Sequence, residues 1–118
     1  MAGRNVTYLS EANMITCVLQ TGLAEDVLDA AKNCGAQGAT ISYGRGTGIR
    51  ERMGLLGVTI DEQKELIRII VSEEQADRVF EAMYLAGGLD TPGKGIMFMT
   101  KLDRVATYIP ESVLKEIA

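Results

Sequence analysis

The residues best suited to binding chemistry lie between positions 44 and 54, where glycines and arginines are interleaved. They are Gly44, Arg45, Gly46, Gly48, Arg50, Arg52 and Gly54. Glycine permits positive φ angles and a close approach of the backbone to a ligand. Guanidinium groups beside exposed amides suit phosphate or carboxylate. The segment therefore predicts a site for an anion. The alternative is a glycine-rich hairpin whose arginines are only solvated.

A second glycine-rich segment, residues 89–95 (LDTPGKG), precedes a strand-like pattern at the corresponding position in the other half of the chain. Pro92-Gly93 is a turn signal, and Lys94 places a cation between Gly93 and Gly95. In an oligomer the two segments would face each other across a subunit boundary. Backbone N–H groups, the arginines of the first segment and Lys94 would then hold a negatively charged ligand.

The apolar residues of the first segment predict a contact surface. Residues 47–62 are too long for a tight hairpin, and the centre of this stretch contains Arg52, Met53, Leu55 and Leu56. Flexible apolar side chains on a loop suit an adaptable partner-binding surface. The alternative, which the sequence leaves open, is that these side chains pack on their own subunit.

Composition narrows the class of function. The chain has 118 residues, enough for one domain, and 12 basic against 16 acidic residues give a net charge of −4. An acidic chain with few aromatic residues is a poor nucleic-acid binder, because phosphate neutralisation requires a basic surface. The chain contains no histidine, which removes most metal-site and histidine-based catalytic schemes.

The cysteines, the apolar runs and the N-terminus together indicate the cellular compartment of the protein. Cys17 lies in an apolar run and Cys34 precedes Gly35 at an expected helix end, so both are interpreted as structural. No apolar run approaches the ~18 residues of a membrane span, so no direct membrane insertion is expected. The N-terminus lacks the charged-then-apolar pattern of a signal peptide. A cytoplasmic location is therefore expected.

Hydrophobic periodicity predicts two strand–helix–strand units. Alternating apolar residues at 13–20, 39–43, 67–71 and 95–100 indicate four strands. Apolar residues at helical spacing in 23–34 and 76–83 indicate two helices. Ser72 and Gln75 form the pattern of a capping box before the second helix. Residues 1–12 are expected to be a leader or an extra edge strand, and residues 13–118 one domain.

The two halves form a weak internal repeat: a shift of 52 positions superposes Val27 on Val79 and Gly35 on Gly87. Two such units predict an α+β, ferredoxin-like βαββαβ plait: an antiparallel sheet with both helices on one face, because each crossover is right-handed. The uncovered face is predicted to carry Thr16, Val18, Gln20, Arg68 and Ile70. Such a mixed face favours burial in an oligomer.

The acidic residues are interpreted as structural or solvated. Glu25, Asp26, Glu73 and Glu74 lie at expected helix starts and complement the helix dipole. Glu65 lies beside the third strand and is expected to be solvated. No side chain stands out as a catalytic base, so an enzyme is not expected. A small phosphate-ester hydrolase that uses arginine and backbone amides stays open as an alternative.

Three segments within residues 13–109 together resemble the P-II nitrogen-regulatory signalling proteins: CGAQGATISYGRGTG, KELIRIIVSEEQADRVFEAM and PGKGIMFMTKLDRV. They are similar to the family's helix end and second strand, its third strand and second helix, and its nucleotide-cradling B-loop and fourth strand. The resemblance implies a ferredoxin-like homotrimer that binds adenine nucleotides in clefts between subunits. It also implies a mobile T-loop at about residues 45–62 that regulates a target protein, either a transporter or an enzyme.

The resemblance also assigns residues to the ligand. Thr40, Gly48 and the main chain near Ile70 would border the adenine, while Gly93 and Gly95 would approach the phosphates. With the cations inferred above, the predicted nucleotide or anion site is Thr40, Arg45, Gly46, Thr47, Gly48, Arg50, Ile70, Gly93, Lys94 and Gly95. The predicted partner-binding residues are Arg52, Met53, Leu55 and Leu56.

The sequence departs from the family at the phosphate contacts. The B-loop pattern Gly-Asp-Gly-Lys begins here at Gly93, with Lys94 in place of the acid and Ile96 in place of the lysine. Thr107 and Ile109 replace paired arginines. Each lost charge-assisted contact costs about 1.5–3 kcal/mol, which predicts weaker binding of a triphosphate.

The expected function is therefore that of a P-II-like regulator. No cofactor or metal is required, and ATP, ADP or AMP are the candidate effectors. An adaptor trimer with a decayed pocket is a further alternative.

Overall fold

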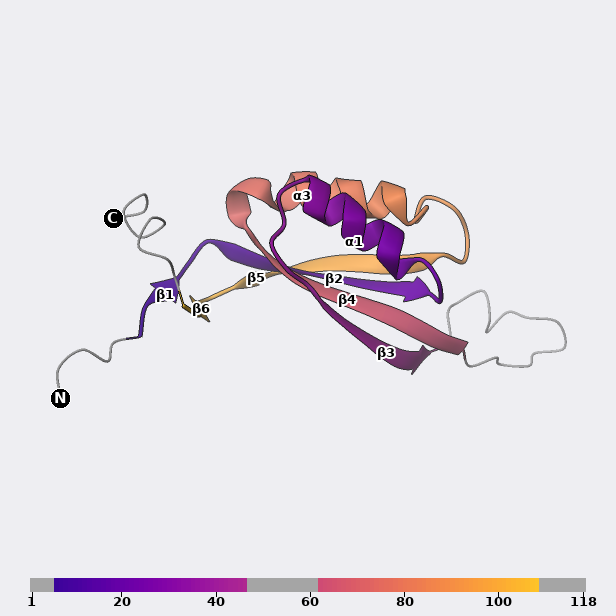
Figure 1. Cartoon of the computed structure of the whole chain (residues 1–118), viewed down its shortest axis with the longest axis horizontal. Helices are drawn as coiled ribbons and strands as arrows, with labels where there is room; N and C mark the ends of the chain where they lie inside the picture. The colour runs from indigo at the N-terminus through magenta and orange to yellow at the C-terminus, as the bar shows by residue number, and fades with distance from the viewer. Residues whose placement is uncertain (1–5, 47–61, 109–118) are drawn as a thin grey trace, which may run out of the picture.

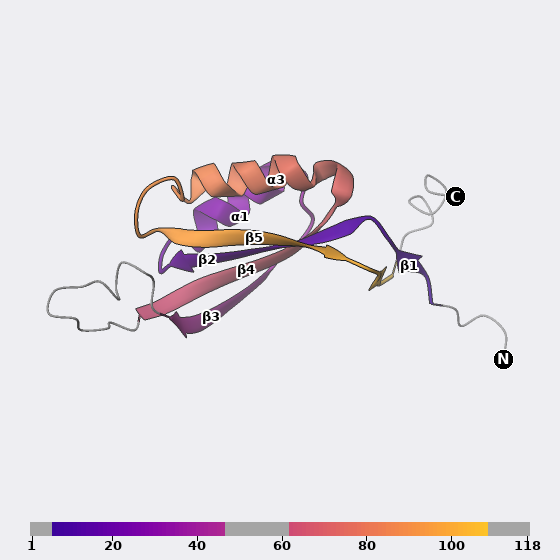
Figure 2. The same ribbon diagram turned by 180° about the vertical axis from the view of Figure 1, so that it is seen from behind.

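The computed structural model describes residues 6–46 and 62–108, which form a sheet covered on one side by two helices (Figures 1 and 2). In chain order the elements are β1 (Tyr8–Leu9), β2 (Ala12–Gln20), α1 (Ala24–Asn33), β3 (Thr40–Gly46), β4 (Glu62–Ser72), α3 (Glu73–Ala86), β5 (Gly95–Leu102) and β6 (Val105–Ala106). The order of the six longer elements is β-α-β-β-α-β, as predicted.

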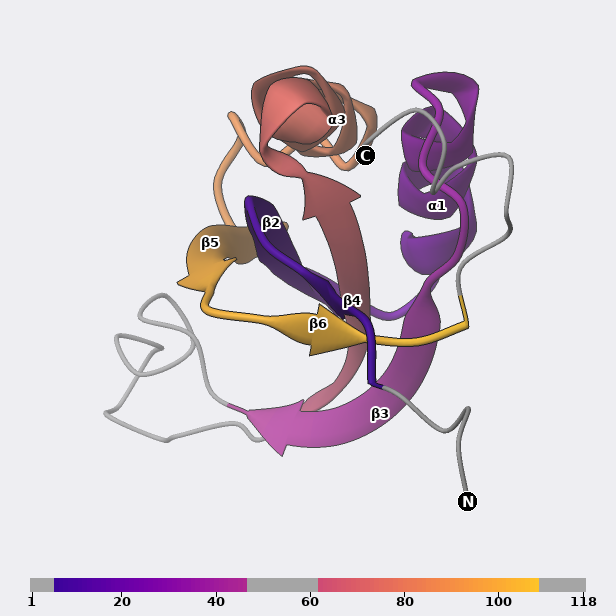
Figure 3. The same cartoon turned by 90° about the vertical axis from the view of Figure 1, so that its left-hand side faces the viewer.

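The main sheet has the strand order β3-β4-β2-β5, and every neighbouring pair is antiparallel. Figure 3, which looks along the molecule, shows α1 and α3 side by side on the same face of the curved sheet. The other face carries no helix among the described residues. The predicted ferredoxin-like α+β fold is confirmed, and the two helices lie on one face as right-handed crossovers require.

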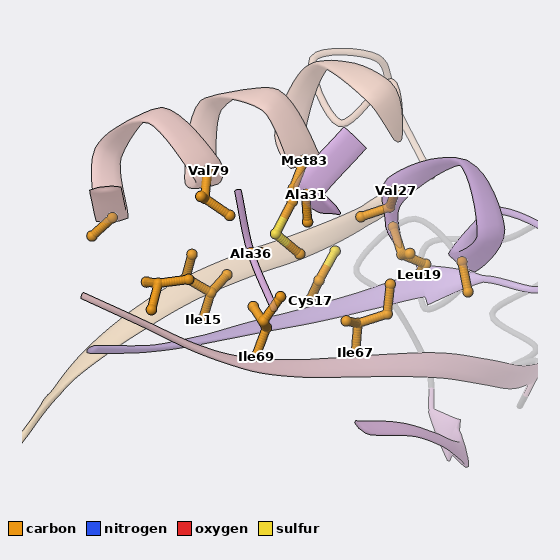
Figure 4. Close-up of a cluster of buried hydrophobic side chains, with 13 residues drawn as sticks. Ile15, Cys17, Leu19, Val27, Ala31, Ala36, Ile67, Ile69, Val79 and Met83 are labelled. Carbon is orange, nitrogen blue, oxygen red and sulfur yellow. The ribbon is translucent and has the colours of Figure 1, made fainter. Parts of the chain in front are cut away.

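The core lies between the sheet and the helices. Alternate residues of β2, namely Ile15, Cys17 and Leu19, point toward the helices and are completely buried (Figure 4). The larger facing residues of β4 and of the two helices belong to the same cluster, together with Ala31: Ile67, Ile69, Val71, Val27, Val79 and Met83. The period of two in the strands and of 3.6 in the helices therefore places all of these side chains in one layer.

The start of α3 has the capping box that the sequence predicts. Gln75 N donates to Ser72 Oγ at 3.3 Å, and Ser72 N donates to Gln75 Oε1 at 3.2 Å. Two of the backbone donors at the helix start are thereby satisfied. The box also fixes the sharp change of direction from β4 into α3, because Ser72 belongs to the strand and Glu73 to the helix.

The expectation that Glu65 is solvated is wrong. Helix α1 begins without a capping side chain of its own, and Glu65 of β4 supplies the missing acceptor. Its Oε1 atom accepts from the backbone N–H groups of Gly22 at 2.6 Å, Leu23 at 3.1 Å and Ala24 at 3.3 Å. A carboxylate at this position satisfies orphan donors and complements the positive end of the helix dipole.

We expect Glu65→Ala to lower the free energy of unfolding by about 2 kcal/mol, because three backbone amides, two of them part-buried, lose a charged acceptor. Urea unfolding followed by circular dichroism measures this change. Glu65→Gln keeps one carbonyl acceptor and should lose less than half as much. Equal stability of Glu65→Ala and the wild type would show that the cap contributes nothing.

The two predicted boundaries of the T-loop, at residues 45 and 62, differ from those in the structure. Arg45 and Gly46, predicted to begin a loop, belong to β3, where Gly46 pairs with Glu62 and Arg45 with Gln63. Residues 45, 46 and 62 are thus strand residues, because ladder hydrogen bonds extend to the ends of both strands. The remainder of the predicted T-loop, 47–61, lies outside the described residues.

No helix among the described residues is long and apolar enough to cross a membrane.

Candidate functional site

The turn before β5 and the open ends of β3 and β4 lie at the same end of the main sheet (Figures 1 and 2). The strand registers show this directly. Gly95 pairs with Leu19, Leu19 pairs with Glu65, and Glu65 pairs with Tyr43, so these four residues form one row across the sheet. The second glycine-rich segment and residues 44–46 of the first are therefore at this end.

At position 95, where the turn meets β5, the backbone accommodates only glycine. Its φ is +156°, and a Cβ atom there would collide with the carbonyl oxygen of Val18 and contact the side chain of Leu89. Next to it, Gln20 N donates to the carbonyl oxygen of Lys94 at 3.1 Å. The backbone of this turn thus packs against the end of β2 in a way that only glycine permits.

Lys94 is held in place through its main chain, while its side chain is half-buried. Gly93, with a φ of +79°, precedes it in the left-handed region. Arg45 is exposed at the far end of β3. The end of the sheet therefore carries two of the predicted cations on backbone that is fixed by ladder and turn hydrogen bonds.

The two cations do not form one site within a single chain. Lys94 leads into β5 and Arg45 belongs to β3, which are opposite edges of the sheet, separated by β4 and β2. With strands about 4.8 Å apart, the two edges lie about 14 Å from each other. The expectation that the two segments face each other requires a subunit boundary, and the structure of one chain does not test it.

Thr40 and Ile70 lie in another part of the sheet. Thr40 begins β3 and pairs with Arg68, and Ile70 follows two residues later on the same uncovered face of β4. Six residues of extended strand separate Thr40 from Gly46, which corresponds to roughly 20 Å. The predicted site is therefore divided within one chain into a group at the sheet end and a group near its middle.

The other predicted residues cannot be placed. Several predicted ligand-binding and partner-binding residues lie outside the described residues: Thr47, Gly48, Arg50, Arg52, Met53, Leu55 and Leu56.

The face that no helix covers is apolar in large part. Ile70 is 51% exposed, Ile96 62% and Phe98 48%. Thr16, predicted for this face, does lie in the row between Arg68 and Phe98, but it is buried at 3% exposure because its neighbours surround it on the central strand β2. Exposed apolar side chains beside a guanidinium group on one sheet face indicate an interaction surface.

Arg68 is the residue near the predicted ligand that sequence reasoning did not assign to the site. It stands opposite Thr40 in the β3–β4 ladder and directly beside Thr16, with its side chain exposed. The alternation of side chains along the strand already predicted that Arg68 lies on the uncovered face. Its proximity to Thr40 depends on a register that only the structure supplies.

The remaining candidates for chemistry are weak. Burial raises the pKa of the Cys17 thiol to about 12, which keeps it protonated and unreactive. The described ranges contain no cluster of three or more potential metal ligands. A hollow of about 440 Å³ between α3 and β5 is lined by Asp77, Phe80, Glu81 and Met99. Its carboxylates disfavour an anion, and it lies on the helix side of the sheet.

Comparisons with known proteins give the following matches. Residues 12–111 match the family model described as Nitrogen regulatory protein P-II. The fold is similar to the crystal structure of Arabidopsis thaliana PII bound to citrate, with a TM-score of 0.64 and 19% sequence identity. That match covers 80% of this chain and 79% of the plant chain. No curated protein sequence matches.

Proposed function

Because the chain belongs to the nitrogen regulatory protein P-II family, we propose that it is a homotrimeric signalling protein that binds a small anionic effector between subunits. P-II proteins as a class are signalling proteins that bind small molecules, form trimers and interact with target proteins. The observation that carries the proposal is the fixed turn at Gly93–Lys94–Gly95, which presents a cation at the same sheet end as the ends of β3 and β4.

The uncovered sheet face supports the trimer. Ile70, Ile96 and Phe98 expose apolar surface that an isolated chain would leave in water. Burial of apolar surface contributes about 25 cal/mol per Å², so packing these faces together would stabilise an assembly. A neighbouring chain would also bring a second sheet end close to Lys94, which one chain cannot do because β3 and β5 lie at opposite edges.

The charges support an anionic ligand. Lys94 and Arg45 stand at the sheet end, and Arg68 stands beside Thr40 on the uncovered face. An adenine nucleotide, ATP, ADP or AMP, is the first candidate effector. The plant relative was crystallised with citrate, another small polyvalent anion. The absence of a lysine at Ile96 favours a ligand with fewer phosphates than ATP.

The proposed output is a change of affinity for a target protein through residues 45–62, with Arg52, Met53, Leu55 and Leu56 as the contact residues. This requires two states of the segment that the effector binds with different affinity. A non-enzymatic, cytoplasmic role completes the proposal, with a transporter or an enzyme as the regulated partner.

Lys94→Ala is expected to weaken the binding of ADP at least tenfold, because a charge-assisted contact contributes about 1.5–3 kcal/mol. Isothermal titration calorimetry against ATP, ADP, AMP and citrate measures the affinity. The melting temperature should not fall, since the contact that fixes the turn is made by the Lys94 carbonyl group.

Lys101→Ala is the matched control. Lys101 lies near the far end of β5, the strand that Lys94 precedes, and its side chain makes an exposed ion pair of 3.7 Å with Glu73, which contributes little. Its affinity for ADP should equal that of the wild type. Equal affinity of Lys94→Ala and wild type would remove Lys94 from the site. Failure of all four ligands to bind the wild type would favour the adaptor function instead.

A further inference from the structure

The hollow between α3 and β5 lies at the open edge of the sheet, on the side that the helices cover. β5 is the last strand in the order β3-β4-β2-β5, and α3 lies over it (Figures 2 and 3). The hollow has a volume of about 440 Å³ and is lined by Asp77, Phe80, Glu81 and Met99. Pockets of roughly 300–1,000 Å³ bind small ligands, so this hollow is large enough for one or two side chains of a partner.

The spacing along both elements brings the four lining side chains together. Positions 77, 80 and 81 are three and four residues apart in α3, so they share one face of that helix. Met99 stands opposite Ile15 in the β2–β5 ladder. Since Ile15 points toward the helices, Met99 is on the helix side as well. The hollow therefore combines an aromatic ring and a thioether with two carboxylates.

The two carboxylates of the hollow are exposed, and within residues 6–46 and 62–108 they have no cationic partner. The neighbouring ion pair uses a different acid, because Lys101 contacts Glu73, one turn before Asp77. Arg78 is the one basic residue of α3, and its Nη2 atom donates to the Cys34 carbonyl oxygen at 3.1 Å, at the end of α1. The described part of the chain thus leaves the negative charge of the hollow unneutralised.

We propose that the hollow binds a basic amphipathic segment of a partner protein, with an arginine side chain between the two carboxylates and apolar side chains against Phe80 and Met99. Residues four positions apart on a helix have Cβ atoms about 5–6 Å from each other, which suits the forked donors of one guanidinium. The Phe80 ring attracts the same cation, and the flexible Met99 side chain adapts to apolar groups of different shape.

Charge argues against the other occupants of the hollow. A second copy of the chain has a net charge of −4, and residues 109–118 contain two glutamates and one lysine. Either would add negative charge beside two carboxylates that are already unneutralised, whereas a basic segment supplies the complementary charge. The inference is independent of the trimer and of the effector, because all the lining residues belong to one chain. It adds a second contact surface to the one proposed for residues 45–62.

The direct test is a nuclear magnetic resonance titration of the ¹⁵N-labelled full-length protein with the peptide acetyl-ALRALLRAL-amide. We expect the peptide to shift the backbone amide signals of residues 77–81 and 97–99 more than those of the rest of the chain. The same peptide with glutamate in place of both arginines should shift none of them, because its charge matches that of the hollow.

Two double variants measure the contribution of the carboxylates. Asp77→Asn with Glu81→Gln should weaken binding of the arginine peptide at least fivefold, because the guanidinium loses both of its charged acceptors. Glu25→Gln with Asp26→Asn is the matched control, since it removes the same two charges from exposed positions in the first turn of α1. This control should bind the peptide as the wild type does.

Two single variants measure the apolar contribution. Met99→Ser should weaken binding of the arginine peptide, because it removes apolar surface from the hollow. Leu85→Ser is its control, since Leu85 is 66% exposed and does not line the hollow. The affinity of Leu85→Ser for the peptide should equal that of the wild type.

Three results would overturn the inference: no shifts with the arginine peptide, shifts concentrated outside α3 and β5, or equal weakening in the two double variants. Signals of the hollow that change on dilution would instead identify a second copy as the occupant. Signals that change in Val113→Asp with Leu114→Asp would identify residues 109–118. Calorimetric binding of ADP to Asp77→Asn with Glu81→Gln should equal that of the wild type, so failure of this inference and failure of the effector site are distinguishable.

Discussion

Gly95→Ala is expected to lower the free energy of unfolding by about 3 kcal/mol, through a collision of its Cβ atom with the Val18 carbonyl oxygen combined with an unfavourable φ of +156°. The β5 start and the turn before it must move to relieve the collision. Because that turn carries Lys94, ADP binding should weaken in the same variant. Urea unfolding and calorimetry measure the two effects.

Gly38→Ala provides the control for the effect of adding a methyl group to a glycine. Gly38 lies before β3 with an ordinary φ, and a Cβ atom there would have no neighbour within 4 Å. Its free energy of unfolding should stay within about 0.5 kcal/mol of the wild type. If Gly95→Ala were as stable as Gly38→Ala, the close approach of the turn to β2 would not exist in solution.

Ile69→Ala should lower the free energy of unfolding by about 3 kcal/mol. Ile69 is 1% exposed and packs in the core between the sheet and the helices, and truncation of a buried isoleucine removes transfer free energy and leaves a cavity. The loss belongs to the fold of each chain. The loss of unfolding free energy for the dissociated chain should therefore be the same at every protein concentration.

Ile70→Ala is the matched comparison, because the next residue along β4 points to the opposite face. We expect it to weaken assembly, seen by sedimentation, while the dissociated chain keeps nearly the stability of the wild type. If Ile70→Ala instead destabilised the dissociated chain as strongly as Ile69→Ala, the uncovered face would be part of the core of one subunit.

The fold could be predicted because local patterns determine it. The alternation of Ile15, Cys17 and Leu19, the helical spacing in 76–83 and the Ser72–Gln75 capping box each depend on residues close in sequence. Right-handed crossovers then leave few arrangements of two strand–helix–strand units. The common face of the two helices follows from these rules together.

Other features depend on pairs distant in sequence, and these could not be predicted. Glu65 caps a helix that begins more than 40 residues earlier, and no local pattern indicates that contact. The pairing of β1 with β6 requires the register that joins Leu9 to Val105. Glycines at 44 and 46 indicated a loop, whereas pairing with β4 keeps them in a strand, since tertiary context overrides local preference.

The turn predicted at Pro92-Gly93 is confirmed, because this dipeptide is a strong turn signal and Gly93 has a positive φ. The ligand-binding role of residues 93–95 stays a prediction, since the close approach that the structure shows at Gly95 is to the Val18 carbonyl oxygen. The relation between this turn and Arg45 could not be predicted, since it depends on which strands lie between them. Arg68 was placed on the right face but not beside Thr40, for the same reason.

Native mass spectrometry of the full-length protein, titrated with ADP and in parallel with ATP, AMP and citrate, tests the central claim most directly, because it counts subunits and ligands at once. We predict assemblies of three chains that carry up to three nucleotides, with no nucleotide on the dissociated chain. A single chain that binds ADP by itself, or trimers that stay free of ligand at saturating ATP, ADP, AMP and citrate, would contradict a site built between subunits.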